Sequence, residues 1–260
     1  MTLLELENIR KSRDGYSLTV RHFHVKAGEF VSVTGESGCG KSTLLDMLAM
    51  LLRPDADAAD GTSPGTFRFF SKGKNGNAVD VKALWQHDRQ DEMARIRRLN
   101  MGYVLQTGDL LPFLNVEENI LLATQLAEKF GEEARAKTDE LLEQLGLTPR
   151  KHAMPAMLSV GERQRAAICR ALAPSPDIVL ADEPTAALDP PKAHEVMKLF
   201  GDIAQKQGVA IVMVSHDRTL LGAFSEAFSI RNVDMAVHAE GGKTSVEVED
   251  RFAEGGRGTL

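Results

Sequence analysis

The chain has 260 residues with a formal net charge of −6, and its 26% charged and 43% hydrophobic residues are an ordinary globular balance. The acidic charge argues against nucleic acid as a partner, because nucleic-acid-binding domains carry clustered Lys and Arg on a basic face. Two cysteines are too few for a disulfide framework, and no apolar run reaches the ~18 residues of a membrane-spanning helix. We therefore expect one domain over residues 1–260, in a reducing compartment.

Alternating apolar and polar residues open the chain. Residues 4–7 and 17–20 change polarity at every position, and this period of two predicts half-exposed antiparallel strands. Residues 30–34 form a short β-rich run that ends at a glycine loop. The leucines after this loop recur at helical spacing until Pro54, which predicts a helix.

The next segment, residues 55–65, is rich in Ala, Asp, Gly and Pro and is expected to be a loop. The β-rich runs 67–70 and 79–81 flank Asn75-Gly76, a dipeptide that is typical of a hairpin turn. A polar helix follows them.

The chain is helical between about residues 109 and 158, after a strand at residues 101–105. Two helix starts each fit a capping box, in which an Asn or Ser caps the helix and a Glu three residues later binds back to the cap. These pairs are Asn115 with Glu118 and Ser159 with Glu162. A helical subdomain over about residues 107–162 is the prediction.

Two near-continuous apolar runs, at residues 177–181 and 209–214, predict parallel strands that are buried on both faces. Shorter β-rich runs follow near residues 228–230 and 246–248, and the tail from about residue 250 to 260 is expected to be disordered. These elements together predict an α/β fold with an antiparallel β subdomain and an inserted α-helical subdomain.

One glycine-rich loop carries a specific chemical signal. It matches G-x-x-x-x-G-K-[ST], follows a strand and opens a helix, which is the context of a phosphate-binding loop. Glycines let backbone amides approach phosphate closely, and the helix N-terminus adds partial positive charge. Lys41 is expected to reach the β- and γ-phosphates and Ser42 to ligate Mg²⁺, so the prediction is a P-loop NTPase core that binds ATP and Mg²⁺. The loop consists of Gly35, Glu36, Ser37, Gly38, Cys39, Gly40, Lys41 and Ser42, and Thr43 follows it.

Two carboxylates end the strand at residues 177–181. Ligands of α/β folds bind at the carboxyl ends of the strands, which places Asp182 and Glu183 near the phosphate loop. Asp182 is expected to hold Mg²⁺ through water, and Glu183 to orient or deprotonate the attacking water. The alternative is a strand that ends in two solvated acids.

The order of the short motifs resembles that of the ABC transporter ATPases. After the phosphate loop come Gln106, the run Leu158-Ser159-Val160-Gly161-Glu162, the pair Asp182-Glu183, the run Ala187-Leu188-Asp189, and His216. The resemblance implies an ATP hydrolase in which Glu183, His216 and Gln106 act in the reaction. It also implies a magnesium ion held by Ser42, Gln106 and Asp182.

The same resemblance implies a head-to-tail dimer of two copies. In the family, the segment that corresponds to Ser159, Val160, Gly161 and Glu162 caps the γ-phosphate bound to the opposite subunit. Asp189 corresponds to a residue of the loop at the dimer interface. The alternative for Ser159 and Glu162 is a helix cap alone, and both roles are compatible because they use the same backbone amides.

Two signature positions depart from the family pattern. Val160 replaces the first signature glycine, and Glu162 replaces a glutamine. A β-branched residue disfavours a positive φ angle and crowds a close approach. Glu162 brings negative charge near a phosphate unless it folds back as the cap partner. We expect slower hydrolysis rather than its loss.

The residue that stacks on adenine is open between two candidates. The family uses an aromatic residue before the phosphate loop, which favours Tyr16. Arg13 stands where that aromatic often lies, and an arginine also stacks on a base.

The segment from Gly108 to Asn119, with the run Ala181 to Ala186, resembles the lipoprotein-release and macrolide-export branch of the family. This resemblance implies a cytoplasmic subunit on the inner face of the cell membrane, whose integral membrane partner contacts the region after Gln106, at residues 110–116. An ABC ATPase that regulates a non-transport membrane or cell-envelope complex is the alternative. A small-molecule kinase with a phosphate loop would leave His216 and the signature unexplained.

Cys39 lies inside the phosphate loop, next to Lys41 and a helix N-terminus. Positive surroundings lower a thiol pKa, so we expect Cys39 to react with maleimide and Cys169, on a core helix, to be inert. The alternative is a Cys39 thiol that turns away from the loop.

Overall fold

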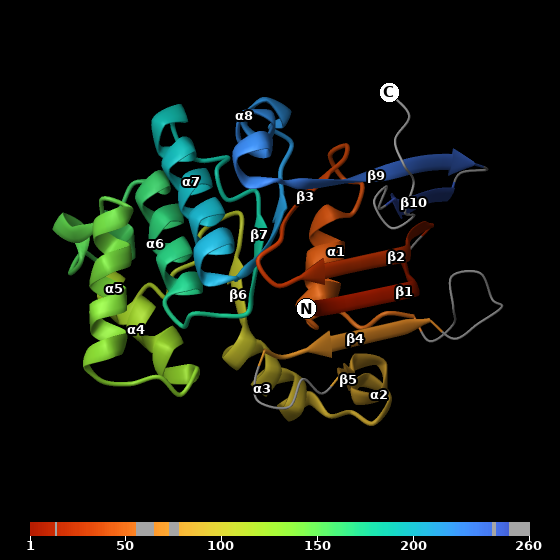
Figure 1. The fold of residues 1–260 in the computed structure, drawn as a ribbon, viewed down its shortest axis with the longest axis horizontal. Coiled ribbons are helices and arrows are strands. Elements are labelled where there is room, and N and C mark those ends of the chain that lie inside the picture. The colour runs from red at the N-terminus through yellow and green to blue at the C-terminus, as the bar shows by residue number, and fades with distance from the viewer. Residues whose placement is uncertain (14, 56–64, 73–77, 241–242, 250–260) are drawn as a thin grey trace.

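The structure is a computed structural model that describes residues 1–13, 15–55, 65–72, 78–240 and 243–249 (Figure 1). The strands in these ranges form a single sheet in the order β5-β4-β1-β2-β10-β9-β3-β8-β7-β6. Helices α4, α5 and α6 form a lobe at the β6 end of this sheet, and β5, β4 and β1 lie at the other end (Figure 1). The expected α/β architecture is therefore confirmed.

One half of the sheet is a parallel core. Its strands β3, β8, β7 and β6 pair in parallel with their neighbours, and every residue of β3, β7 and β8 is buried. The near-continuous apolar runs therefore form the predicted buried strands, and the carboxyl ends of the strands share one edge of the sheet. The bounds are β3 (Phe30–Thr34), β8 (Ala210–Val214), β7 (Ile178–Asp182) and β6 (Met101–Val104).

The other half contains the predicted antiparallel subdomain. Strand β1 pairs antiparallel with β2 and β4, and β4 pairs antiparallel with β5, so the predicted hairpin strands are present. Strand β10 joins the two halves, because it is parallel to β2 and antiparallel to β9, which pairs with β3. The bounds are β1 (Thr2–Arg13), β2 (Tyr16–Lys26), β4 (Thr66–Phe70), β5 (Ala78–Asp80), β9 (Arg231–Glu240) and β10 (Lys243–Glu249).

Helices cover both faces of the sheet. Alternate residues of β7 enter two separate cores, with Ile178 and Leu180 on the side of α1 and with Val179 and Ala181 on the side of α6 and α7. The helices are α1 (Lys41–Leu48), α2 (Val81–Gln86), α3 (Gln90–Asn100), α4 (Val116–Leu126), α5 (Glu132–Gln144), α6 (Val160–Leu172), α7 (Pro190–Gln207) and α8 (Arg218–Phe228), with short 3-10 turns at Thr148–Arg150 and Pro155–Met157. None of the described helices is long and apolar enough to span a bilayer.

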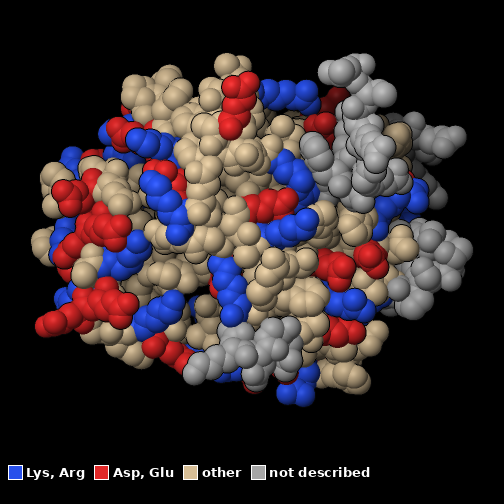
Figure 2. All heavy atoms as spheres, viewed as in Figure 1, with Lys and Arg blue, Asp and Glu red and all other residues tan. Residues whose placement is uncertain are grey.

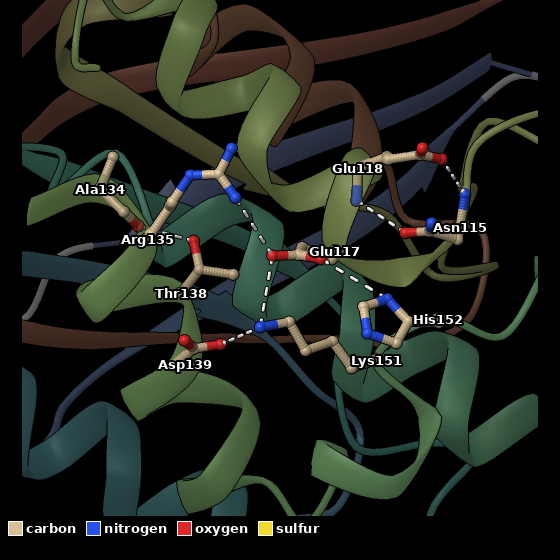
Figure 3. A network of polar contacts seen from close by, with 9 residues as sticks. All are labelled: Asn115, Glu117, Glu118, Ala134, Arg135, Thr138, Asp139, Lys151 and His152. Atoms are coloured by element: carbon tan, nitrogen blue, oxygen red, sulfur yellow. Dashed lines mark hydrogen bonds and ion pairs between the residues drawn. The ribbon is translucent and has the colours of Figure 1, made fainter. Parts of the chain in front are cut away.

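Both predicted capping boxes are present, at the starts of α4 and α6. A polar network further ties the helical lobe together (Figure 3). Glu117, in the first turn of α4, lies 3.3 Å from Lys151, 3.8 Å from Arg135 and 3.6 Å from His152. Because Arg135 belongs to α5, these contacts join α4, α5 and the turn before α6 into one unit.

The strand expected near residues 228–230 begins slightly later, because Phe228 ends α8 and β9 starts at Arg231. Phe224 and Phe228 stack with ring centroids 5.9 Å apart, which is a contact between residues four apart on one helix face. Helix α1 also ends at Leu48, ahead of Pro54. The expected Asn75-Gly76 turn and the tail from residue 250 to 260 lie outside the described residues.

Figure 2 shows one face of the molecule, on which basic and acidic side chains are interspersed. The described residues of this face form no continuous basic stripe of the kind that follows a nucleic-acid backbone.

Candidate active site

The phosphate loop connects β3 to α1 at the shared edge of the parallel strands. Gly38 and Gly40 have φ angles of 78° and 93°, in the left-handed region that glycine adopts readily. Gly40 is the N-cap of α1 and supplies no side-chain cap, so the first amides of α1 are available to an anion. The Lys41 ammonium donates to the carbonyls of Gly35 (3.0 Å) and Glu36 (2.8 Å) and thus lies over its own loop.

Tyr16 of β2 pairs with Arg13 of β1, so the two candidates for the adenine platform are neighbours on adjacent strands. The Tyr16 hydroxyl donates to the Cys39 carbonyl over 2.8 Å, and burial raises the pKa of Tyr16 to about 12. Sequence patterns did not indicate this contact with the phosphate loop. Adenine stacking by either residue stays a prediction.

Glu183 and His216, predicted separately, meet at the ends of neighbouring strands. The Glu183 carboxylate lies 2.9 Å from His216 Nδ1, and its side chain is 11% exposed against 71% for His216. The Glu183 amide donates to the Val214 carbonyl, at the end of β8. The φ angle of Glu183 is 47°, in the left-handed region, as at six other described residues that are not glycine.

The residues assigned to Mg²⁺ supply oxygen ligands only. Ser42 lies exposed in the first turn of α1, Asp182 is buried at the end of β7, and Gln106 lies exposed after β6. Among the described residues no group of three or more His, Cys, Asp or Glu could hold a metal alone. Mg²⁺ is usually bound by one or two carboxylates together with waters and substrate phosphates. The set contains one carboxylate, that of Asp182, and two neutral oxygen ligands, so its chemistry fits Mg²⁺.

The segment after Gln106 is attached to helix α6. The Leu105 carbonyl accepts a bond from Gln164, and the Asp109 carbonyl accepts one from Arg170, over 3.2 and 2.6 Å. Both donors belong to the helix that begins with the signature. The residues on either side of Gln106 are therefore hydrogen-bonded to the helix that Ser159 caps, a contact that the order of motifs did not reveal.

Asn119 shapes the next part of this segment and was missed by sequence reasoning. It is 1% exposed, its amide nitrogen donates to the carbonyls of Leu111 and Leu114, and its amide oxygen accepts from the Leu111 amide. The sequence signal was an Asn one helical turn after the cap residue Asn115, directly before an apolar run. An amide that is buried at such a position needs hydrogen-bond partners.

The signature turns out to be a satisfied helix cap. Ser159 accepts from the Glu162 amide, and the Glu162 carboxylate accepts from the Ser159 amide (2.8 Å) and from Arg150 (2.9 Å). The Ser159 amide, followed by Arg150, holds the pKa of Glu162 below its usual range. The expected repulsion between the Glu162 carboxylate and a phosphate is thus reduced, because this carboxylate folds back onto the helix cap.

The φ argument against Val160 is wrong, because Val160 is the first residue of α6 and has no positive φ angle. Its side chain is nevertheless 56% exposed beside Ser159. Close to it, a Cβ on Gly161 would lie 3.3 Å from Leu188, and Asp189 caps α7 by accepting from the Lys192 amide. The signature and the predicted dimer loop are therefore neighbours.

Cys39 is not a reactive thiol in this structure. It is 3% exposed and packs in the core, where burial raises its pKa although Lys41 opposes the shift. Burial likewise raises the pKa of Cys169, to about 12. We expect maleimide to label both cysteines slowly in the native chain and rapidly in denaturant, as mass spectrometry of labelled peptides would show. Fast native labelling of Cys39 would contradict this burial.

Comparisons with known proteins show which family the chain belongs to. The sequence model described as ABC transporter matches residues 18–186. The lipoprotein-releasing system ATP-binding protein LolD of Hydrogenovibrio crunogenus is 36% identical over 88% of this chain and 93% of its own length. The macrolide export ATP-binding/permease protein MacB of Marinobacter nauticus is 38% identical over 83% of this chain. The chain spans only 31% of the length of that MacB protein and 33% of a pyoverdine export relative, PvdT of Pseudomonas putida.

Solved structures show the same likeness. A dimeric bacterial ABC transporter cassette, MJ0796, has a TM-score of 0.71 and 29% identity, and the match covers 89% of this chain and 94% of that one. A dimeric post-hydrolysis state of the same cassette, bound to ADP and Pi, has a TM-score of 0.66 and 31% identity over 84% of this chain and 90% of that one. The family match covers well over half of the sequence, and therefore the chain belongs to the ABC transporter family as an ATP-binding cassette.

Proposed function

We propose that this chain binds and hydrolyses ATP between two copies of itself and thereby powers a separate integral membrane subunit. The observation that carries the proposal is the 2.9 Å contact between Glu183 and His216. It lies at the edge of the sheet where the phosphate loop leads into α1. A relative solved with ADP and Pi, and relatives named as export and lipoprotein-release proteins, support the same reading.

The side chains have distinct tasks in this reaction. Lys41 exchanges its two carbonyl acceptors for the phosphates of ATP, and the amides at the start of α1 bind the same phosphates. Glu183 accepts a proton from the attacking water, while His216 holds its carboxylate in place. Ser42, Asp182 and Gln106 would hold Mg²⁺, which supplies neutralisation of the charge on the phosphates.

The second copy completes the site in this proposal. Its Ser159 and the amides at the start of α6 would face the γ-phosphate, as a helix N-terminus suits an anion. Val160 is exposed, and a Cβ on the next residue, Gly161, would lie 3.3 Å from Leu188, which precedes Asp189. Dimeric relatives support a pairing of this kind.

A cavity of about 320 Å³ beside the Gln106 segment is the proposed contact for the membrane subunit. Its apolar wall includes Leu111, Leu122 and the 53% exposed Leu126. Phe113 is 70% exposed on the loop that Asn119 braces, within the segment 110–116 that the family resemblance assigns to the membrane partner. The partner would hold the chain on the inner face of the cell membrane.

Phe113→Asp should release the chain from membranes. Aromatic hot spots at interfaces contribute about 2 kcal/mol or more, so we expect the affinity for the membrane subunit to fall about 30-fold or more. Phe130→Asp is the matched control, because Phe130 is 68% exposed on the loop between α4 and α5. Co-purification followed by mass identification of the partner measures both variants.

Equal release of the two Phe variants, or retention of both, would contradict the proposed contact. The identity of the recovered membrane protein separates a transporter from a non-transport envelope complex.

Val160→Ala should speed hydrolysis if the exposed valine crowds the partner's phosphate. We expect turnover to rise about threefold at unchanged ATP affinity, which corresponds to about 0.7 kcal/mol of relieved crowding. Alanine suits the helical start of α6, whereas Val160→Gly also adds backbone freedom, so comparison of the two variants separates bulk from flexibility. Steady-state phosphate release measures both, and slower turnover in both would end the crowding explanation.

A further inference from the structure

The hydroxyl of Tyr16 touches the phosphate loop from outside. It donates to the Cys39 carbonyl over 2.8 Å, and a Cβ added to Gly40 would lie 1.7 Å from the hydroxyl oxygen. The tyrosine tip therefore fills the space beside the last glycine before Lys41. A base-stacking role uses the face of an aromatic ring and does not require this contact of the hydroxyl.

The contact fixes the orientation of one peptide group. The described chain has no cis peptide bond, so the Cys39–Gly40 peptide is trans and its carbonyl and amide point in opposite directions. With the Cys39 carbonyl held toward Tyr16, the Gly40 amide lies in the same peptide plane and points away from Tyr16. Gly40 is also the N-cap of α1 at a φ angle of 93°, where glycine has wide conformational freedom.

Tyr16 belongs to a strand that pairs with a neighbour on each side. It begins β2, where it pairs with Arg13 of β1 on one side and with Thr244 of β10 on the other. The Thr244 amide also donates to the Gly15 carbonyl. With a pKa near 12, the hydroxyl remains a proton donor at neutral pH. A group held by three strands is suited to position a flexible glycine loop.

We propose that the Tyr16 hydroxyl is a positioning group that aligns the phosphate loop, and through it the Gly40 amide, for the phosphate chain of any nucleoside triphosphate. The proposal rests on the proposed ATP-binding function. It assigns Tyr16 a role toward phosphate, which is independent of any contact with adenine.

Tyr16→Phe is the test, because it retains the ring and removes only the hydroxyl. Thr138→Val is the matched control, since the Thr138 hydroxyl also donates to a backbone carbonyl over 2.8 Å, within α5. Hydrogen–deuterium exchange without nucleotide should be faster for the peptide covering residues 35–43 in Tyr16→Phe and unchanged there in Thr138→Val. This arm needs no ligand, so it reports on the loop even if the parent chain binds no nucleotide, a result that would defeat the proposed function alone.

Binding then separates phosphate from base recognition. Affinities for Mg-ATP, Mg-GTP and magnesium tripolyphosphate should all fall by the same factor in Tyr16→Phe, about threefold to tenfold, the net worth of one hydrogen bond. Unchanged exchange in the loop would overturn the proposal. A loss confined to Mg-ATP would overturn it as well, because that result assigns Tyr16 to adenine.

Discussion

A Glu183→Gln variant is expected to bind Mg-ATP as the parent does and to hydrolyse it about 10²–10⁴ times more slowly, the usual contribution of a general base. In the parent chain the Glu183 carboxylate lies 2.9 Å from His216 Nδ1. Glutamine keeps the size of the side chain and can keep this hydrogen bond, but its amide cannot accept a proton from water. Phosphate release at saturating Mg-ATP, with a separate titration of nucleotide binding, measures the two effects.

Asp177→Asn provides the control for Glu183→Gln. Asp177 directly precedes β7, at the opposite end of the strand from Glu183, and contacts Lys72 instead of the phosphate loop. Its turnover should match the parent. Hydrolysis at the parent rate in Glu183→Gln would show that another group activates the water.

Lys41→Ala is expected to weaken ATP binding itself. A hydrogen bond to a charged group contributes about 1.5–3 kcal/mol, so we expect affinity to fall about 10- to 150-fold. This ammonium donates to two carbonyls of its own loop, acceptors that phosphate oxygens can replace. Equilibrium titration with a fluorescent ATP analogue gives the affinity.

Lys72→Ala is the matched control, because the Lys72 ammonium also donates to a backbone carbonyl, that of Gly208, far along the sequence from the loop. Its nucleotide affinity should equal that of the parent. If the two variants bind ATP equally well, Lys41 does not act on the phosphates.

Local sequence rules predicted much of this fold. The strands at β3, β7 and β8 follow from continuous apolar runs, because strands buried on both faces need apolar residues at every position. The capping boxes before α4 and α6 follow from side-chain chemistry within four residues. Apolar runs and capping boxes depend on residues close together in the sequence, and the elements that they predict are present in the folded chain.

Contacts between distant segments were harder to predict. The Cys39 pKa depends on packing beneath the loop, which outweighs the nearby charge of Lys41. The bond from Tyr16 to Cys39 joins residues 23 positions apart, and that from Gln164 to Leu105 joins residues 59 apart. No local pattern encodes such pairs, because they arise only when the sheet and the helical lobe assemble.

The signature shows how both kinds of information combine. Sequence alone left Glu162 between a harmful charge near phosphate and a cap partner, and the structure selects the cap. Arg150, 12 positions earlier, adds the ion pair that no motif indicated. Val160 is exposed beside Ser159, and its effect on the rate of ATP hydrolysis stays a prediction.

The central claim, that ATP joins two copies of the chain through Ser159, is tested most directly by the mass of Glu183→Gln in solution. Light scattering during gel filtration should give a monomer without nucleotide and a dimer with Mg-ATP. Adding Ser159→Arg to this variant should leave a monomer in both conditions, because a bulky side chain blocks the start of α6. A monomer of Glu183→Gln in saturating Mg-ATP, or a dimer that persists with Ser159→Arg, would contradict the account.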